Sequence, residues 1–177
     1  MEGYGRLSME SVARRAKVGK TALYRRWPSK REMVVAIVSG LAATAIPFAD
    51  TGSLTSDVSA FLREAHEALL TPMVSEILPD LLAEGARSSQ LADDLLSSVR
   101  DPRRARAGDL IRRAINRGEL PDEVDIETAV DLLAGPLYWR ITVVRTPTDA
   151  AYIDRLTHIV VAGIKAAAQV PDTVGGN

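Results

Sequence analysis

Apolar residues recur at helical spacing along almost the whole 177-residue chain. Met9, Val12, Ala13 and Ala16, for example, stand three or four positions apart, which places them on one face of a helix. Runs that alternate apolar and polar residues are nearly absent, and the hairpin dipeptides Asn-Gly and Asp-Gly do not occur. Prolines and glycines divide the pattern into segments, with Gly118 expected to end one long helical region. The sequence therefore predicts an all-α fold.

Short polar side chains predict where several of these helices begin. Ser8 is a suitable N-cap for the first apolar stripe, because its hydroxyl can accept a hydrogen bond from a free backbone N–H of the first turn. Ser29, followed three residues later by Glu32, forms a capping box at the start of a long apolar helix. Further along, we expect Thr55 or Ser56 to cap the next helix.

Charge is distributed unevenly between the start of the chain and the rest. Residues 1–46 contain nine Lys and Arg against three acidic residues, a net charge of +6, although the whole chain has a net charge of −1. The remaining residues therefore sum to −7. Such an asymmetry predicts an N-terminal surface for a polyanion and a body with another role.

Two short helices joined by the corner Lys-Val-Gly form a helix-turn-helix pattern near the N-terminus. In the second helix, Leu23 and Trp27 are one turn apart and are expected to pack inward together with Val18. The opposite face begins with small side chains, which allow a helix end to approach base edges in the major groove. The candidate DNA-contacting side chains on this face and beyond it are Lys20, Thr21, Ala22, Tyr24, Arg25 and Lys30.

These residues also carry a resemblance to a known family. The stretch GYGRLSMESVARRAKVGKTALYRRWPSKREMVVAIV resembles the DNA-binding region of tetracycline-repressor (TetR) family transcriptional regulators, and the later stretches GPLYWRITV and YIDRLTHIVVAGI resemble their C-terminal part more loosely. The resemblance implies that Lys20, Thr21 and Ala22 face base edges. It further implies that Ser8, Tyr24, Arg25 and Lys30 hold phosphates.

The same resemblance implies a domain organisation. It divides the chain into a helix-turn-helix DNA-binding domain over 1–46 and a helical ligand-binding and dimerisation domain over 47–177. Family members normally have one more helix before the position of Gly3 and Tyr4, which the 177 residues do not include, so we expect an incomplete DNA-binding domain. At the corner, Lys17 stands where the family often has Gly, and a positive φ at a non-Gly residue costs about 1–2 kcal/mol.

The C-terminal body shows no pattern of catalytic residues. His66 and His158 are far apart in the sequence and belong to no metal-binding motif, and the chain contains no cysteine. Asp93 and Asp94 are consecutive and would point about 100° apart on a helix, a poor geometry for paired carboxylates. We therefore expect neither an enzyme nor a metal or organic cofactor, and the absence of cysteine fits a cytoplasmic protein.

The last two predicted helices, over 126–145 and 148–169, are apolar around most of their circumference, which predicts burial both in their own core and against a partner. This pattern favours a homodimer formed through these helices. Two helix-turn-helix units, which we call reading heads, on one duplex then imply a roughly palindromic operator. A pocket for a small hydrophobic or amphipathic effector is expected between the central helices. Its candidate lining residues are Phe61, Leu62, His66, Leu69, Leu81, Leu110, Leu137 and Tyr138.

The sequence thus favours a ligand-responsive transcriptional regulator, most simply a repressor that a small effector releases from double-stranded DNA. The alternative is a dimeric helical protein that binds a small molecule but has an impaired DNA-binding head. For Tyr138 and His66, a structural role in the core or in an interface remains open beside the role in a pocket.

Overall fold

The computed structural model describes residues 7–43, 50–87 and 89–167, and these residues form helices and their connections without any strand. This confirms the all-α prediction. The described helices group into two compact units, one comprising 1–46 with 72–103 and the other 47–71 with 104–177. The domain boundary predicted between residues 46 and 47 lies outside the described residues, as do Gly3 and Tyr4.

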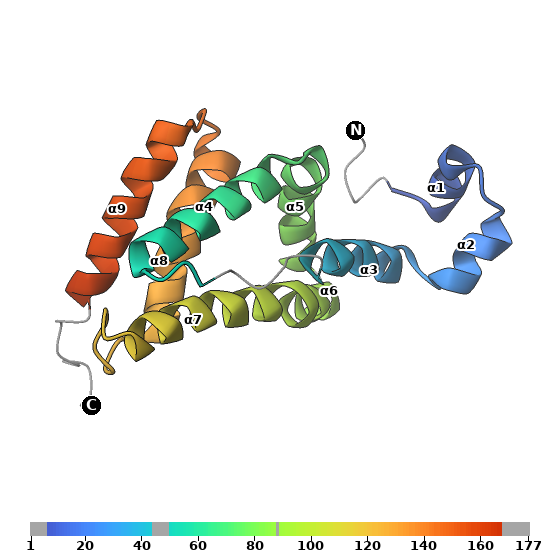
Figure 1. Cartoon of the computed structure of the whole chain (residues 1–177). Helices are drawn as coiled ribbons and strands as arrows, with labels where there is room; N and C mark the ends of the chain where they lie inside the picture. Colours follow the sequence, from blue (N-terminus) through green and yellow to red (C-terminus); the bar gives the residue numbers. More distant parts are fainter. Residues whose placement is uncertain (1–6, 44–49, 88, 168–177) are drawn as a thin grey trace. The chain divides into compact units, whose positions relative to one another are not determined.

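The first unit combines the N-terminal helices with a later helical segment (Figure 1). Its apolar core contains Leu81 from that later segment together with residues from three N-terminal helices. Its elements are α1 (Met9–Ala16), α2 (Lys20–Arg26), α3 (Lys30–Ala43), α5 (Pro72–Gly85), α6 (Ser89–Leu95) and a π-helical turn, η2 (Leu96–Arg100). Its buried core side chains are Met9, Ala13, Leu23, Met33, Val34 and Leu81.

The second unit is built around the packing of α4 against α8 and α9 (Figure 1). A single core cluster joins these helices to α7, and Leu62, Leu110 and Leu133 in it are fully buried. Its elements are α4 (Leu54–Leu70), α7 (Asp101–Asn116, the first three residues of which group with the first unit), α8 (Ile126–Tyr138), a second π-helical stretch, η3 (Trp139–Val144), and α9 (Ala150–Ala167).

Gly118 ends α7, as the sequence predicts. Its φ is +72°, a conformation that favours glycine. Its N–H donates to the carbonyl of Ile115 (2.8 Å), and the N–H of Glu119 donates to the carbonyl of Ala114 (2.9 Å). These are the two hydrogen bonds of a Schellman motif, which satisfies carbonyls that the helix end leaves free.

The predicted start of α4 was wrong by two or three residues. Ser53, rather than Thr55 or Ser56, is the N-cap, and its Oγ accepts a hydrogen bond from the N–H of Ser56 at 3.2 Å. The reason lies in a tertiary contact: the carboxylate of Glu119 accepts from the N–H of Leu54 at 2.8 and 2.9 Å, so this amide at the helix start is also satisfied.

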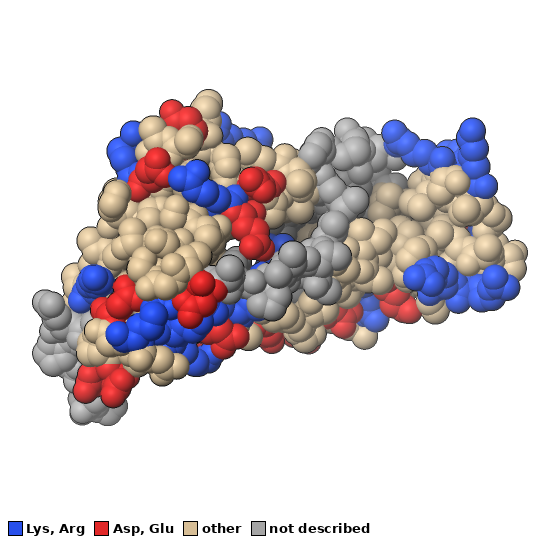
Figure 2. Space-filling view, viewed as in Figure 1, with Lys and Arg blue, Asp and Glu red and all other residues tan. Residues whose placement is uncertain are grey.

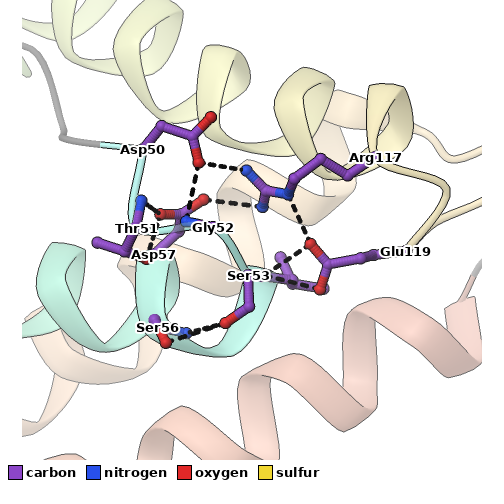
Figure 3. A network of polar contacts seen from close by, with 9 residues as sticks. Asp50, Thr51, Gly52, Ser53, Ser56, Asp57, Arg117 and Glu119 are labelled. Atoms are coloured by element: carbon purple, nitrogen blue, oxygen red, sulfur yellow. Dashed lines mark hydrogen bonds and ion pairs between the residues drawn. The ribbon is translucent and has the colours of Figure 1, made fainter.

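A polar cluster around the buried carboxylate of Asp57 surrounds this helix start (Figure 3). Arg117 donates to Asp50 (2.7 Å), Asp57 (2.9 Å) and Glu119 (2.7 Å), so one guanidinium joins three carboxylates from both sides of the contact. Asp57 also accepts from the backbone N–H and the hydroxyl of Thr51. The cluster fixes residues 50–57 to the C-terminal end of α7, and we call it the Arg117 cluster.

None of the helices in the described ranges combines the length and the apolar character needed to cross a membrane.

Candidate nucleic-acid interface

The helix-turn-helix consists of α1, a three-residue corner and α2. Ser8 caps α1 as predicted, since its Oγ accepts a hydrogen bond from the N–H of Ser11 at 3.2 Å. Lys17 ends α1 in the left-handed region, with φ 55° and ψ 36°. Its neighbour Val18 donates to the carbonyl of Ala13 at 3.0 Å, which turns the chain sharply into α2. The corner therefore orients α2 through a strained non-Gly residue.

The inner side of α2 packs on α1 and α3 through apolar side chains. Leu23 is buried in the core of the first unit, and Trp27 is half-buried beside it. The prediction that Val18 also packs inward was wrong, because its side chain is 45% exposed. Leu23 and Trp27 are one turn apart, so their burial leaves the opposite face of α2 on the surface.

The candidate DNA-contacting residues all lie on the first unit. Lys20, Thr21, Ala22, Tyr24 and Arg25 are exposed on α2, and Ser8 is exposed at the start of α1. Lys30 is half-buried at the start of α3, next to the capping box in which the Ser29 Oγ accepts from the N–H of Glu32 at 3.1 Å. The structure thus places small and basic side chains together on an open helix face.

Glu10 contacts two of these candidate residues, which the sequence analysis did not anticipate. Its Oε1 lies 2.7 Å from the Nζ of Lys20 and accepts a hydrogen bond from the Oη of Tyr24 at 3.4 Å. The Nζ of Lys20 also lies 5.7 Å from the centre of the Tyr24 ring, within range of a cation–π contact. We call these three residues the Glu10 cluster.

Basic atoms occur at the edges of the part that carries α1 and α2, whereas basic and acidic atoms alternate over α7 and α8 (Figure 2). Ion pairs explain the second pattern: Arg104 of α7 pairs with Glu127 and Asp131 of α8, and Arg112 pairs with Asp109. Arg14, Arg15, Lys17, Arg25 and Arg26 are all exposed in the first unit. Its helix-turn-helix therefore presents the basic surface that a phosphate backbone requires.

The candidate effector-binding residues do not all come together. Leu81 belongs to the core of the first unit, and the other seven belong to the second unit. Of these, Phe61, Leu62, Leu110 and Leu137 are buried in the core cluster, and His66, Leu69 and Tyr138 are half-buried.

Two of the half-buried residues have polar groups with distinct surroundings. The Nε2 of His66 lies 2.6 Å from the Oγ1 of Thr148, so this histidine has a hydrogen-bond partner inside the protein. Burial raises the pKa of the Tyr138 phenol, which is therefore neutral at physiological pH. Both side chains keep a polar group inside the second unit, in a site or in the core.

A surface groove of about 510 Å³ lies between α4 and α9, and none of the eight candidate effector residues lines it. The groove is instead lined by Thr55, Ser56, Ser59, Ala60, Arg63, Asp154, Thr157 and His158. Arg63 pairs with Asp154 across it at 2.7 Å.

Elsewhere in this unit, the Nε and Nη2 of Arg113 are buried without a hydrogen-bond partner among the described residues. Arg113 belongs to no motif in the sequence that would distinguish it from the other arginines of this region.

Comparison with known families matches both parts of the chain. Residues 1–37 match the model of the bacterial regulatory proteins of the tetR family, and residues 48–160 match the model of the tetracyclin repressor-like C-terminal domain. The second match alone covers more than half of the chain.

Individual relatives and a solved structure agree with these matches. The chain is 33% identical to the DNA-binding transcriptional repressor TetR of Mycobacteroides abscessus, over 88% of this chain and 81% of that protein. It is 27% identical to an uncharacterized HTH-type transcriptional regulator, YdeS, of Bacillus subtilis, over 93% of this chain and 83% of that one. The crystal structure of the TetR family transcription regulator SCO0332 superimposes with a TM-score of 0.72 and 29% identity, covering 90% of this chain and 88% of the other.

Proposed function

Because the chain belongs to the tetracycline-repressor family of DNA-binding transcriptional regulators, we propose that it is a repressor. As a homodimer it binds a roughly palindromic operator, and it leaves this operator when a small hydrophobic or amphipathic effector binds. The observation that carries the proposal is the open, basic face of α2. Five candidate contact residues lie exposed there, opposite the buried Leu23. Small residues at the helix start suit base edges, and the basic residues suit phosphates.

Selection from a pool of random-sequence duplexes tests the DNA-binding part of the proposal. The 177-residue chain is expected to enrich a motif of two inverted half-sites, because a symmetric dimer presents two copies of α2. Its affinity for that motif should fall steeply between 50 and 200 mM salt, since phosphate contacts release counterions. If no motif is enriched and all duplexes bind equally weakly, the chain is no operator-binding repressor, and small-molecule binding with an impaired head becomes the better account.

The dimer is supported by apolar side chains that the second unit leaves exposed. Trp139 and Val143 of η3 are 60% and 51% exposed, and Ile159 of α9 is 65% exposed. Next to Ile159 on the same face of α9, Ala162 is also exposed, so a partner helix can approach closely there. Large exposed apolar residues on adjacent helices are typical of an interface.

Analytical ultracentrifugation of the Ile159→Glu variant tests this interface. A carboxylate in the middle of an apolar contact cannot be solvated, so the variant is expected to sediment as a monomer where the unchanged protein sediments as a dimer. Leu70→Glu is the matched control, because Leu70 of α4 is 52% exposed outside the proposed interface. Equal sedimentation of both variants and the unchanged protein would refute the role of α9.

The effector site is proposed among the seven candidate residues of the second unit. Phe61, Leu62 and Leu110 are packed in its core, so a ligand can enter among them only if the helices move apart. A ligand that favours the separated arrangement changes the population of conformations, which is what regulation requires. Arg113 favours an amphipathic ligand with an acidic group, because its buried Nε and Nη2 donors have no partner among the described residues.

Matched pairs of carboxylic acids and their amides test the effector proposal. Both members of a pair offer the same apolar area, but only the acid offers an anionic partner for Arg113. The acids are expected to raise the melting temperature more than the amides and to release the enriched duplex at lower concentration. In Arg113→Gln, the advantage of the acids should disappear.

A further inference from the structure

We propose that Glu10 is a specificity-determining positioning residue. It holds Lys20 and Tyr24 on the exposed face of α2, which we call the reading face, and it reduces the attraction of that face to DNA of any sequence. The inference rests on the proposed DNA-binding function and adds a residue that itself opposes DNA binding. Glu10 is the only acidic residue between positions 7 and 31, a stretch that contains eight Lys and Arg. A carboxylate among these cations lowers the affinity of the surface for a polyanion, so its presence there needs a structural explanation.

The geometry of the Glu10 cluster provides that reason. Glu10 is the second residue of α1, and its partners Lys20 and Tyr24 stand on successive turns of α2. A single oxygen, Oε1, receives both the ammonium group at 2.7 Å and the phenol at 3.4 Å. The carboxylate thus joins the two helices of the reading head at the surface, and it gives the long Lys20 side chain a defined direction.

Both members of the ion pair keep their charge. The hydrogen bond from Lys20 lowers the pKa of Glu10, and the hydrogen bond to Glu10 raises the pKa of Lys20. The two side chains are 52% and 60% exposed, so water and DNA phosphates can reach both. Exposed pairs of this kind contribute little to folding, and partners can therefore be exchanged readily.

The consequences differ for specific and non-specific DNA. Phosphate contacts carry no sequence information, and their number sets both the non-specific affinity and its salt dependence. Because Glu10 neutralises Lys20 locally, it removes one cation from this sequence-independent attraction. A contact between a lysine and the guanine edge depends on direction as well as on charge, and Glu10 supplies that direction. Glu10 therefore lowers the affinity for DNA of any sequence and increases the preference for the specific sequence.

Glu10→Gln tests the proposal, with association constants measured by fluorescence anisotropy for the enriched duplex and for a random-sequence duplex between 50 and 200 mM salt. The variant removes the charge and leaves the length of the side chain unchanged. Its affinity for the random duplex is expected to rise about threefold to tenfold at 50 mM salt, with a salt slope steeper by about 0.9 as Lys20 gains a phosphate. Affinity for the enriched duplex should rise less, so that the ratio of the two falls at least about threefold.

Two further variants separate position from charge. Glu84→Gln is the charge-matched control, because Glu84 of α5 pairs with Arg87 at 2.8 Å and contacts no candidate DNA residue in the described structure. It should change neither affinity nor slope. Glu10→Asp keeps the charge on a shorter side chain that cannot reach both partners. It should keep the salt slope of the unchanged protein and still lose part of the specificity ratio.

The outcomes distinguish this inference from the proposed function. If selection enriches a motif but Glu10→Gln behaves like Glu84→Gln, the role of Glu10 is wrong and the repressor proposal stands. An unchanged specificity ratio in both Glu10 variants would also overturn it. If selection enriches nothing, the repressor proposal fails, and the random-duplex measurements still decide whether Glu10 weakens non-specific attraction.

Discussion

Each unit of the molecule contains a cluster in which a carboxylate binds a cationic side chain, at nearly equal distances but in different surroundings. Glu10 lies 2.7 Å from Lys20 in the first unit, and Asp57 lies 2.9 Å from Arg117 in the second. The side chains of the first pair are more than half exposed, whereas Asp57 is fully buried and Arg117 is 22% exposed.

This difference in burial decides what each cluster can do. Lys20 and Glu10 are solvated whether or not they touch, so the pair can open and offer its charges to a ligand. Asp57 has lost its water and depends on Thr51 and Arg117 for its hydrogen bonds. The Glu10 cluster is suited to exchanging its charge contacts with a ligand. The Arg117 cluster is suited to fixing the chain at the start of α4 to the end of α7.

The largest effect is expected from Arg117→Met, which leaves Asp57 buried without its charged partner. Removing one member of a buried pair costs about 3–5 kcal/mol, and the free energy of unfolding of the second unit should fall by about this amount. Urea unfolding followed by the fluorescence of Trp139, in a Trp27→Phe background, reports this unit. Arg112→Met is the control, because the exposed pair of Arg112 with Asp109 should contribute about 0.2–1 kcal/mol. Equal losses in both variants would mean that burial does not distinguish the pairs.

As the pH is lowered, the ion pairs of the Arg117 cluster should weaken while the apolar core is still packed. Burial alone raises the pKa of Asp57, but the hydrogen bonds from Thr51 and Arg117 outweigh it, and the net pKa is lowered. The pKa of Glu119 is likewise lowered, since the N–H of Leu54 and the guanidinium of Arg117 outweigh the effect of burial.

For such carboxyl groups, the folded state binds fewer protons than the unfolded state near pH 4. Their contribution to stability is therefore full above the unfolded pKa of about 4, and it is lost as the pH falls through the lower folded value. Urea midpoints of the second unit should decrease from pH 5 to pH 3. The decrease should be smaller in Arg117→Met, in which one cause of the lowered pKa is gone. Identical pH profiles would contradict this assignment.

A smaller gain of stability is expected from Lys17→Gly in the first unit. Lys17 has φ 55°, where a Cβ atom costs about 1 kcal/mol or more, so glycine should stabilise the unit by about 0.5–1 kcal/mol after its greater freedom in the unfolded chain is counted. Lys17→Ala removes the same charge but keeps the Cβ atom, and it should give no such gain. Urea unfolding followed by Trp27, in a Trp139→Phe background, measures both variants. A gain shared by both would assign the effect to charge.

The smallest effect on stability is expected from Glu10→Gln. The Glu10 pair is open to solvent, so the urea midpoint of the first unit should stay within experimental error of the unchanged protein while DNA binding changes. This combination sharpens the contrast with Arg117→Met. A clear loss of stability in Glu10→Gln would mean that the Glu10 cluster supports the fold, as the Arg117 cluster does.

Local sequence predicted the features that depend on neighbouring residues. The Ser8 cap, the capping box of Ser29 and Glu32, and the glycine at position 118 each follow from groups within a few residues of one another. The open face of α2 follows in the same way, because Leu23 fixes which side is buried. A helix end or a helix face is set by hydrogen bonds and spacing inside one segment, so the residues themselves contain the answer.

Tertiary structure alone decided which distant segments meet. Glu119 approaches Leu54 across 65 positions and Arg117 approaches Asp57 across 60, and these contacts moved the start of α4 to Ser53. The placement of Leu81 in the core of the first unit and the contact of Glu10 with Lys20 were also decided there. Periodicity shows that a side chain is buried or exposed, but it does not name the partner, because many apolar stripes and opposite charges in one chain are equally compatible. The sequence by itself determined the all-α fold and the exposed face of α2, and packing determined which carboxylates each cation meets.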